Sequence, residues 1–441
     1  MDVWIGIDLG STTTKAVVMD ESGDIVGRGI TNSRSNYDVA ARIVREEALV
    51  NTRFSLMHQR VADQVGLGVA EEEFVRALER DFRLHQHLEQ LDSLRDEMQA
   101  VALVPRHERY QRELRELIES IADEMSARSR VHYSERSTRK SDFFRDLAAA
   151  DYMGLAEQHA DPKGITFETL SGIFDAAILV VENSAHDGAF ARHIVPALEK
   201  TLAEAGPLLA PHAGRLREAV EAVRATEVLD QNTVGTGYGR QRLPFPKEQI
   251  RSEILCHGLG AHALFPGTRT VLDIGGQDTK AIQTDDSGIV TSFQMNDRCA
   301  AGCGRYLGYI ADEMNLGLHE LGPLAQKSSC RVKINSTCTV FAGAELRDRL
   351  SLGQRREDIL AGLHRAIILR ALSLLARSGG IEEEFTFTGG VARNLAAVAA
   401  LRDLVEENYG HRTLNISTES IYTGALGAAL FARRGAEKAA A

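Results

Sequence analysis

Hydrophobic and polar positions follow two different patterns along the 441 residues of this chain. Near the N-terminus, short apolar runs separated by polar turns predict three β-strands between residues 3 and 30. The strand pattern returns at residues 270–283 and again at Phe385–Thr388. Between these regions, from Asn36 to Thr226, apolar residues recur mostly at three- and four-residue steps, which is typical of amphipathic helices.

A similar polar turn follows a buried strand in each of the first two strand-rich regions. The first reads DLGSTTTK from Asp8 to Lys15, and the second reads DIGGQDTK from Asp273 to Lys280. Small residues let backbone N–H groups approach a phosphate, and a lysine adds a point charge. The first turn does not have the P-loop pattern. One such turn could be a plain hairpin, but two in one chain predict a nucleotide bound between two lobes.

A third glycine-containing turn follows the strand Phe385–Thr388. Gly389 and Gly390 come directly after the strand, and a helix is predicted to start near Asn394. Glycine lets the backbone approach a flat base or a ribose, and a helix N-terminus then faces the ligand.

The repeated turns predict a two-lobed α/β protein with a large helical insertion. Lobe I is expected to comprise residues 1–32 and 186–270, and lobe II residues 271–423. The insertion is expected at residues 33–185, and a C-terminal helix and tail at residues 424–441. The length also fits two or three domains.

Two cysteines, Cys299 and Cys338, each follow a small polar run and open an apolar, helix-like segment. A helix N-terminus lowers a thiol pKa and favours the thiolate, which suits a metal–sulfur centre. Two cysteines are half of a four-cysteine iron–sulfur shell. The alternatives are small buried side chains, or an intrachain site with Cys303 and Cys330, although the spacing matches no zinc-ribbon pattern.

Other candidate groups receive structural interpretations. Cys256 and His257 are neighbours on a helix predicted over residues 248–263, and adjacent helical side chains diverge, so we expect buried packing rather than metal ligation. The basic run at residues 128–140 is expected to be a solvated face, with docking of an acidic partner or a coenzyme phosphate as the alternative.

Composition excludes several classes of function. The net charge of −11 argues against a broad nucleic-acid surface. No apolar run approaches the ~20 residues of a membrane span, so no membrane association is expected. Five cysteines and no basic signal sequence before the first apolar run indicate a reducing cytoplasm.

The three turns, in this order, resemble those of the actin-like ATPase superfamily, which includes sugar kinases and Hsp70. The cysteine segments NDRCAAGCGRYL and INSTCTVFA are similar to those of ATP-dependent electron activators. That family contains activators of 2-hydroxyacyl-CoA dehydratases and the ATP-hydrolysing subunits of benzoyl-CoA reductase. The resemblance covers residues 1–32 and 228–434.

The resemblance implies a two-lobed actin/Hsp70/sugar-kinase-like ATPase fold. Because activators of dehydratases lack a large insertion, it favours the larger ATPase subunit of benzoyl-CoA reductase. Such a subunit would couple ATP hydrolysis to electron transfer from ferredoxin for reduction of an aromatic ring. A stand-alone dehydratase activator, and a small-molecule kinase or non-redox nucleotide switch, are the alternatives.

The family also implies cofactors and partners. A [4Fe-4S] cluster would be shared with a smaller homologous ATPase subunit, and Cys299 and Cys338 would be the two ligands from this chain. Two benzoyl-CoA-binding reductase subunits would hold the substrate, and ferredoxin would supply the electron. Cys303, Arg393 and Ile421 depart from the activator pattern, and the last two bear on contacts to the base.

ATP and Mg²⁺ would bind between the lobes. Asp8 would hold Mg²⁺, and Asp273 would orient the metal or the attacking water. The expected nucleotide-binding residues of the three turns are Gly10, Ser11, Thr12, Thr13, Thr14 and Lys15, then Gly275, Gly276 and Gln277, and finally Gly389, Gly390 and Asn394.

Overall fold

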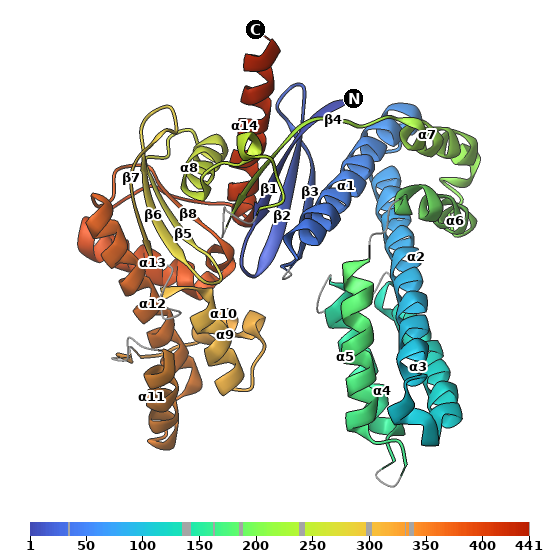
Figure 1. The fold of residues 1–441 in the computed structure, drawn as a ribbon. Helices are drawn as coiled ribbons and strands as arrows, with labels where there is room; N and C mark the ends of the chain where they lie inside the picture. The colour runs from blue at the N-terminus through green and yellow to red at the C-terminus, as the bar shows by residue number, and fades with distance from the viewer. Residues whose placement is uncertain are drawn as a thin grey trace. The chain divides into compact units, whose positions relative to one another are not determined.

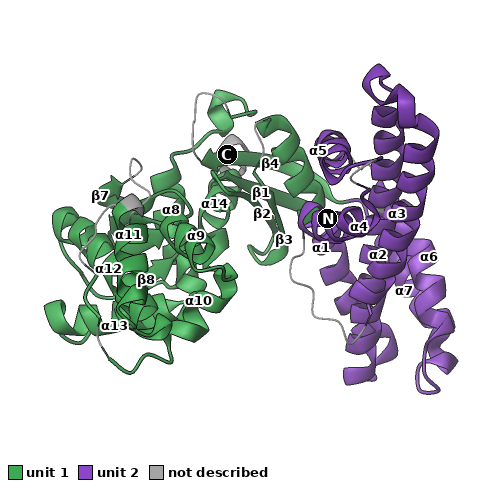
Figure 2. Cartoon of the chain, turned by 90° about the horizontal axis from the view of Figure 1, so that it is seen from below, with its two compact units in different colours: residues 1–48, 228–441 green, residues 49–227 purple. Residues whose placement is uncertain are grey.

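A computed structural model describes residues 1–33, 36–134, 143–161, 164–184, 188–237, 243–296, 302–330, 332–334 and 339–440. The chain forms two compact units (Figure 2). Unit 1 comprises residues 1–48 and 228–441, and unit 2 comprises residues 49–227. Both expected cluster ligands, Cys299 and Cys338, lie outside the described residues.

The first sheet of unit 1 has the strand order β3-β2-β1-β4 (Figure 1). Its strands are β1 (Asp2–Leu9), β2 (Thr13–Asp20), β3 (Ile25–Asn32) and β4 (Leu229–Gly237). β1 runs antiparallel to β2 and parallel to β4. The apolar side chains of Val3, Ile5, Ile7 and Leu9 share one face of β1 and are buried, whereas the buried residues of the other face are Gly6 and Asp8.

The second sheet of unit 1 has the order β7-β6-β5-β8-β9. Its strands are β5 (Thr270–Ile274), β6 (Thr279–Thr284), β7 (Val290–Asn296), β8 (Phe385–Thr388) and β9 (Leu414–Ile416). It repeats the first sheet, since β5 is antiparallel to β6 and parallel to β8. Asp8 pairs with Lys15 in the first hairpin, and Asp273 pairs with Lys280 in the second. The two sequence turns are therefore equivalent in structure.

The helices of unit 1 that follow β4 pack on its two sheets or on one another. They are α8 (Glu253–Leu264), α9 (Gly304–Glu313), α10 (Leu318–Ala325), α11 (Thr339–Ser351), α12 (Arg356–Ser378), α13 (Leu395–Tyr409) and α14 (Thr423–Ala440). The largest apolar core lies where α12 meets α9, α10, α13 and the second sheet. By length and composition α12 could cross a membrane, but 61% of its most apolar window is buried in the protein. We therefore interpret it as a core helix.

Helix α14 packs against β1 and α8 at very close range. A Cβ atom on Gly6 would lie 2.0 Å from the Ala425 carbonyl oxygen, and one on Gly427 would lie 1.9 Å from the Cys256 carbonyl oxygen. Only glycine fits at either position. Cys256 is fully buried in this packing, as the sequence predicts, and burial raises the pKa of its thiol to about 12.

All the regular elements in the described part of unit 2 are helices. Its helices are α1 (Tyr37–Val65), which begins in unit 1, α2 (Val69–Ala102), α3 (Gln111–His132), α4 (Phe144–His159), α5 (Phe167–Asn183), α6 (Ala189–Ala203) and α7 (Ala213–Ala225). One core joins α2 to α3, α4 and α5, and a second joins α1 and α2 to α6 and α7. Part of the basic run 128–140 lies outside the described residues.

The observed unit boundary differs from the expected insertion at residues 33–185. Helices α6 and α7 group with unit 2 because their apolar faces pack on α1 and α2. The Phe190 ring lies 6.0 Å from the Phe54 ring and 5.5 Å from the Phe82 ring, measured between centroids. These contacts join residues more than 100 positions apart, which helical periodicity alone does not reveal.

Candidate functional site

The two equivalent hairpin turns meet in unit 1. A Cβ atom on Gly276 would lie 2.3 Å from the Thr12 hydroxyl oxygen, so the two turns are in direct contact. Within the second turn, the Gly275 N–H donates to the Asp278 carbonyl at 3.0 Å. The glycines thus allow an approach that side chains would block, and small residues line the place where the turns converge.

Ser33 braces the first turn and was not indicated by the sequence motif. Its hydroxyl donates to the Gly10 carbonyl at 2.5 Å, and its N–H donates to the Thr12 carbonyl at 2.9 Å. Its hydroxyl also lies 3.2 Å from the Thr14 hydroxyl. The sequence signal for this role is the position of Ser33 directly after β3, because β3 pairs with β2, the strand that follows the first turn.

Lys280 lies at the centre of a buried group of carboxylates behind the turns. Its ammonium is 2.9 Å from Glu253 Oε1, 2.9 Å from Asp278 Oδ1 and 3.4 Å from Asp273 Oδ1. Only 2% of the Lys280 side chain is exposed. Burial acts to lower the lysine pKa, but the three carboxylates outweigh it and raise that pKa well above its ordinary value.

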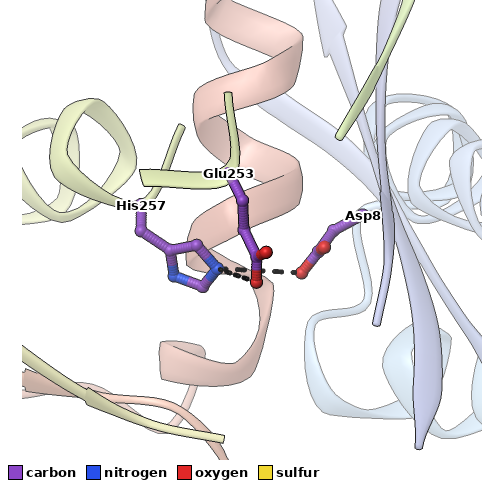
Figure 3. Close-up of side chains that lie close together, drawn as sticks. All are labelled: Asp8, Glu253 and His257. Atoms are coloured by element: carbon purple, nitrogen blue, oxygen red, sulfur yellow. Dashed lines mark ion pairs between the residues drawn. The ribbon is translucent and has the colours of Figure 1, made fainter. Parts of the chain in front are cut away.

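His257 joins the same group from helix α8. Its Nδ1 lies 3.3 Å from Asp273 Oδ2, and its Nε2 lies 4.0 Å from both Asp8 Oδ2 and Glu253 Oε1 (Figure 3). Burial acts to lower the pKa of His257, but the charge of Asp273 and its other acidic neighbours produce a net increase. Thr388 donates to Asp273 Oδ2 at 2.8 Å and fixes that carboxylate.

The expectation of plain buried packing is thus incomplete for His257. The ring is buried, but its nitrogens face carboxylates instead of apolar groups. Glu253 and His257 are four residues apart and therefore share one helical face. This spacing, and not the pair Cys256 and His257, was the sequence signal for an acidic partner of the histidine.

The charges in this group fit a divalent cation. The carboxylates of Asp8, Glu253, Asp273 and Asp278 each lie within 4.0 Å of Lys280 or His257, so acidic groups outnumber these two basic groups. Mg²⁺ prefers oxygen ligands and keeps several of its waters, so carboxylates suit it as ligands.

The geometry around Asp8 supports the same fit. Oδ1 of Asp8 is buried and has no hydrogen-bond partner among the described residues. One ligand atom each from Asp8, Glu253 and His257 lies within 4.8 Å of the others. A Cβ atom on Gly424 would lie 2.8 Å from both Asp8 Oδ2 and His257 Nε2, so glycine keeps this space open.

The third turn leads from β8 through Gly389 into helix α13. Gly389 has φ of +86°, and a Cβ atom there would lie 2.4 Å from the Ile274 carbonyl oxygen. The Asn394 side chain caps α13, because its Oδ1 accepts from the N–H groups of Ala396 and Ala397 at 3.0 and 3.2 Å. Gly390 and Arg393 are exposed beside this turn.

Asn394 is held in turn by His364, a buried residue of α12 that the sequence did not indicate. His364 Nδ1 donates to the Leu360 carbonyl at 2.7 Å, because a carbonyl can only accept. Burial lowers the pKa of His364, so the ring is neutral and its Nε2 accepts from the Asn394 amide at 3.0 Å. The turn is therefore braced from the core of lobe II.

The structure brings Asp8, Thr12, Asp273 and Gly276 together from the two halves of the sequence. Of the described cysteines, Cys303 is buried at the N-terminus of α9 and Cys330 is exposed. The remaining assignments of the nucleotide-binding and cluster-binding residues stay predictions.

Comparison with known proteins shows the family of the chain. The model of the BadF/BadG/BcrA/BcrD ATPase family matches residues 5–432. The chain is 44% identical over 208 residues to the (R)-2-hydroxyglutaryl-CoA dehydratase activating ATPase of Acidaminococcus fermentans, covering 47% of this chain and 76% of that protein. It is 31% identical over 218 residues to one subunit of the benzoyl-CoA reductase of Thauera aromatica, covering 49% and 75% respectively.

A solved structure supports the predicted fold. The activator of 2-hydroxyisocaproyl-CoA dehydratase from Clostridium difficile, with bound ADPNP, superposes with a TM-score of 0.54 at 22% identity. The match covers 99% of this chain and 97% of that one. The predicted fold class, a two-lobed actin- and sugar-kinase-like ATPase, is confirmed.

Proposed function

Because this chain belongs to the BadF/BadG/BcrA/BcrD ATPase family, we propose that it is an ATP-hydrolysing electron activator for a partner enzyme that acts on an acyl-CoA thioester. The observation that carries the proposal is the contact between the turns Asp8–Lys15 and Asp273–Lys280, the two phosphate turns, beside a buried group in which carboxylates outnumber basic side chains. This arrangement suits a nucleotide triphosphate and one divalent cation.

The residues of the chain have separate tasks in this proposal. Asp8 and Glu253 hold the waters of Mg²⁺, and the Lys280 ammonium pairs with the carboxylates of Glu253 and Asp273. Asp273, fixed by Thr388 and paired with His257, orients the attacking water. Backbone N–H groups of Ser11–Lys15 and Gly275–Gln277 bind the phosphates, while Gly389, Gly390 and Asn394 face the adenosine.

The electron-carrying centre is proposed from the sequence segments alone. Cys299 and Cys338 would each provide one thiolate, and a homologous ATPase subunit would provide two more. A [4Fe-4S] cluster in that position supplies storage for one electron at low potential. Each cysteine precedes a helix of lobe II, α9 or α11, in the sequence, so both thiolates belong to the lobe that contains the second phosphate turn.

The partner we favour is a 2-hydroxyacyl-CoA dehydratase, supported by the identity of 44% to an activating ATPase of that class. Anaerobic purification, followed by mixing with a dehydratase, ATP, Mg²⁺ and a reductant, tests this directly. Dehydration of 2-hydroxyacyl-CoA that depends on ATP supports the proposal. A colourless protein that instead phosphorylates a small molecule would show that it is a kinase.

Benzoyl-CoA reductase is the second candidate for the partner. It is supported by the identity of 31% to one subunit of that enzyme. Unit 2 also favours the reductase, because a large helical insertion is expected in the larger ATPase subunit of benzoyl-CoA reductase and not in dehydratase activators. Anaerobic pull-down with mass spectrometry separates the candidates, since copurification with a smaller ATPase chain and two reductase chains indicates the reductase, and a homodimer indicates the activator.

A further inference from the structure

The segment between β9 and α14 holds the third turn by hydrogen bonds to Gly389. The Gly389 N–H donates to the Ser420 carbonyl at 3.3 Å, and the Ser420 hydroxyl donates to the Gly389 carbonyl at 3.4 Å. Only 1% of Ser420 is exposed, so water cannot replace either bond. One serine therefore contacts both backbone polar groups of the glycine that opens the third turn.

Ser420 is itself fixed by residues on both sides. Its N–H donates to the Ser417 carbonyl at 3.1 Å, and its carbonyl also accepts from the Thr423 hydroxyl at 2.8 Å. Thr423 is fully buried and is the first residue of α14, which packs on the first sheet. The short 3-10 helix η7 (Ser420–Tyr422) also contacts β2 of that sheet. The position of Ser420 therefore depends on the first sheet as well as on the second.

An ion pair between Arg28 and Glu419 joins the same segment to the first sheet. Arg28 Nε lies 2.8 Å from Glu419 Oε2. Arg28 belongs to β3 of the first sheet, whereas Glu419 follows β9 of the second sheet and directly precedes Ser420. The two side chains are 35% and 38% exposed, so either partner can be replaced without opening the core.

The charges that act on Tyr422 place this ion pair near the third turn. Burial and the charge of Glu419 raise the pKa of Tyr422, whereas Arg393 and Arg28 act to lower it. Arg393 is the last residue of the 3-10 helix η6 (Gly390–Arg393), which follows Gly389 in the third turn. Charged groups from β3, from the segment after β9 and from the third turn thus lie around one half-buried tyrosine.

We propose that Arg28, Glu419 and Ser420 are positioning residues for the third turn, and that the Arg28–Glu419 ion pair slows the release of an adenine nucleotide. This inference rests on the proposed function, which assigns contacts with the adenosine to Gly389 and its neighbours. While the ion pair is formed, the first sheet holds Ser420 against Gly389. When the ion pair breaks, the third turn loses this support and the nucleotide dissociates faster.

Dissociation of a fluorescent ADP from the full-length protein, followed by stopped flow with Mg²⁺ present, tests the inference. We expect Arg28→Gln and Glu419→Gln each to raise the dissociation rate about two- to fivefold, the effect of losing one exposed ion pair. The double variant should release ADP no faster than either single variant, because both substitutions act through the same pair. The matched control is Arg217→Gln, which removes an ion pair with Glu199, also at 2.8 Å, from unit 2.

Two further measurements distinguish positioning from a general loss of structure. Ser420→Ala should also raise the rate of ADP dissociation at least about twofold, because it removes a buried hydrogen bond to the third turn. Ser171→Ala removes a serine-to-backbone hydrogen bond from an exposed helix position and should not change that rate. Tripolyphosphate has no adenosine, so its affinity should be the same in all these variants and in the wild type.

Four results would each overturn the inference. They are wild-type release of ADP from Arg28→Gln and Glu419→Gln, an equal effect of Arg217→Gln, additive effects in the double variant, and a loss of tripolyphosphate affinity that matches the faster release of ADP.

The readout also separates this inference from the proposed function. Release of ADP requires neither the iron–sulfur cluster nor the partner enzyme. If the variants behave as expected but the wild type never activates a partner enzyme, the proposed function fails and the positioning role stands. If ATP-dependent activation is normal and the variants release ADP like the wild type, the inference alone fails.

Discussion

The ammonium group of Lys280 offers the sharpest test of the buried charge group. Replacing Lys280 with methionine keeps most of the side-chain volume and removes the charge that faces Glu253, Asp273 and Asp278. Removing one partner from a buried ion pair costs about 3–5 kcal/mol, because the remaining charge is left uncompensated. The 2% exposure of Lys280 means that water cannot replace the lost charge.

The expected effect is large enough for a thermal-unfolding assay. At about 2–4 °C per kcal/mol for a domain of 150–250 residues, the unfolding midpoint of unit 1 should fall by roughly 6–20 °C. Without the ammonium group, the carboxylates should bind a cation more tightly. Mg²⁺ should therefore raise the midpoint of Lys280→Met by more than it raises that of the wild type.

The matched control is Lys327→Met, which removes an exposed lysine from the same unit. Calorimetry or circular dichroism, with and without Mg²⁺, gives the comparison. If Lys280→Met melts within about 2 °C of the control, a difference of ~1 kcal/mol or less, the ammonium does not hold the carboxylates together. The charge count behind the divalent-cation site would then be wrong.

Three further substitutions test other parts of the site. Gly389→Ala should weaken ADP binding at least about tenfold by calorimetry, because its φ of +86° and the 2.4 Å approach to a carbonyl exclude a Cβ atom, whereas Gly308→Ala should bind normally. His364 should cost the wild type stability below about pH 6.5, because the unfolded histidine takes up a proton that the buried ring, with its lowered pKa, resists. His364→Gln should lack this loss. Denaturation at several pH values measures it, and equal losses in both proteins would disprove the prediction. Cys338→Ser should lose its iron and Cys303→Ser should keep it, as measured on anaerobically purified protein, and full iron content in Cys338→Ser would exclude that ligand.

Much of the fold could be predicted from the sequence, because the signals were local. Each phosphate turn is a continuous run of small and polar residues between two apolar strands, so its position follows from strand periodicity alone. The repeat also predicts that Asp8 and Asp273 occupy equivalent positions, and the pairing with Lys15 and Lys280 shows that they do. Lys280 is nevertheless buried among carboxylates, which no local pattern indicates.

The missed residues depend on contacts between distant segments. Ser33 braces a turn more than 20 residues earlier, and His364 orients an asparagine 30 residues later. His257 became interpretable only when β5 placed Asp273 beside its helix. None of these residue types indicates a role by itself. Each role depends on a partner residue that is distant in the sequence and close in the fold.

The close packing of α14 on β1 has a consequence for the order of folding during synthesis. Glycine at position 6 accepts the backbone of residues 425–429, more than 400 positions later. β1 is therefore synthesised more than 400 residues before the helix that packs against it. Unit 2 has cores of its own and can fold during that interval, since domains generally fold as units. Until α14 is synthesised, the face of β1 at Gly6 has no helix to cover it.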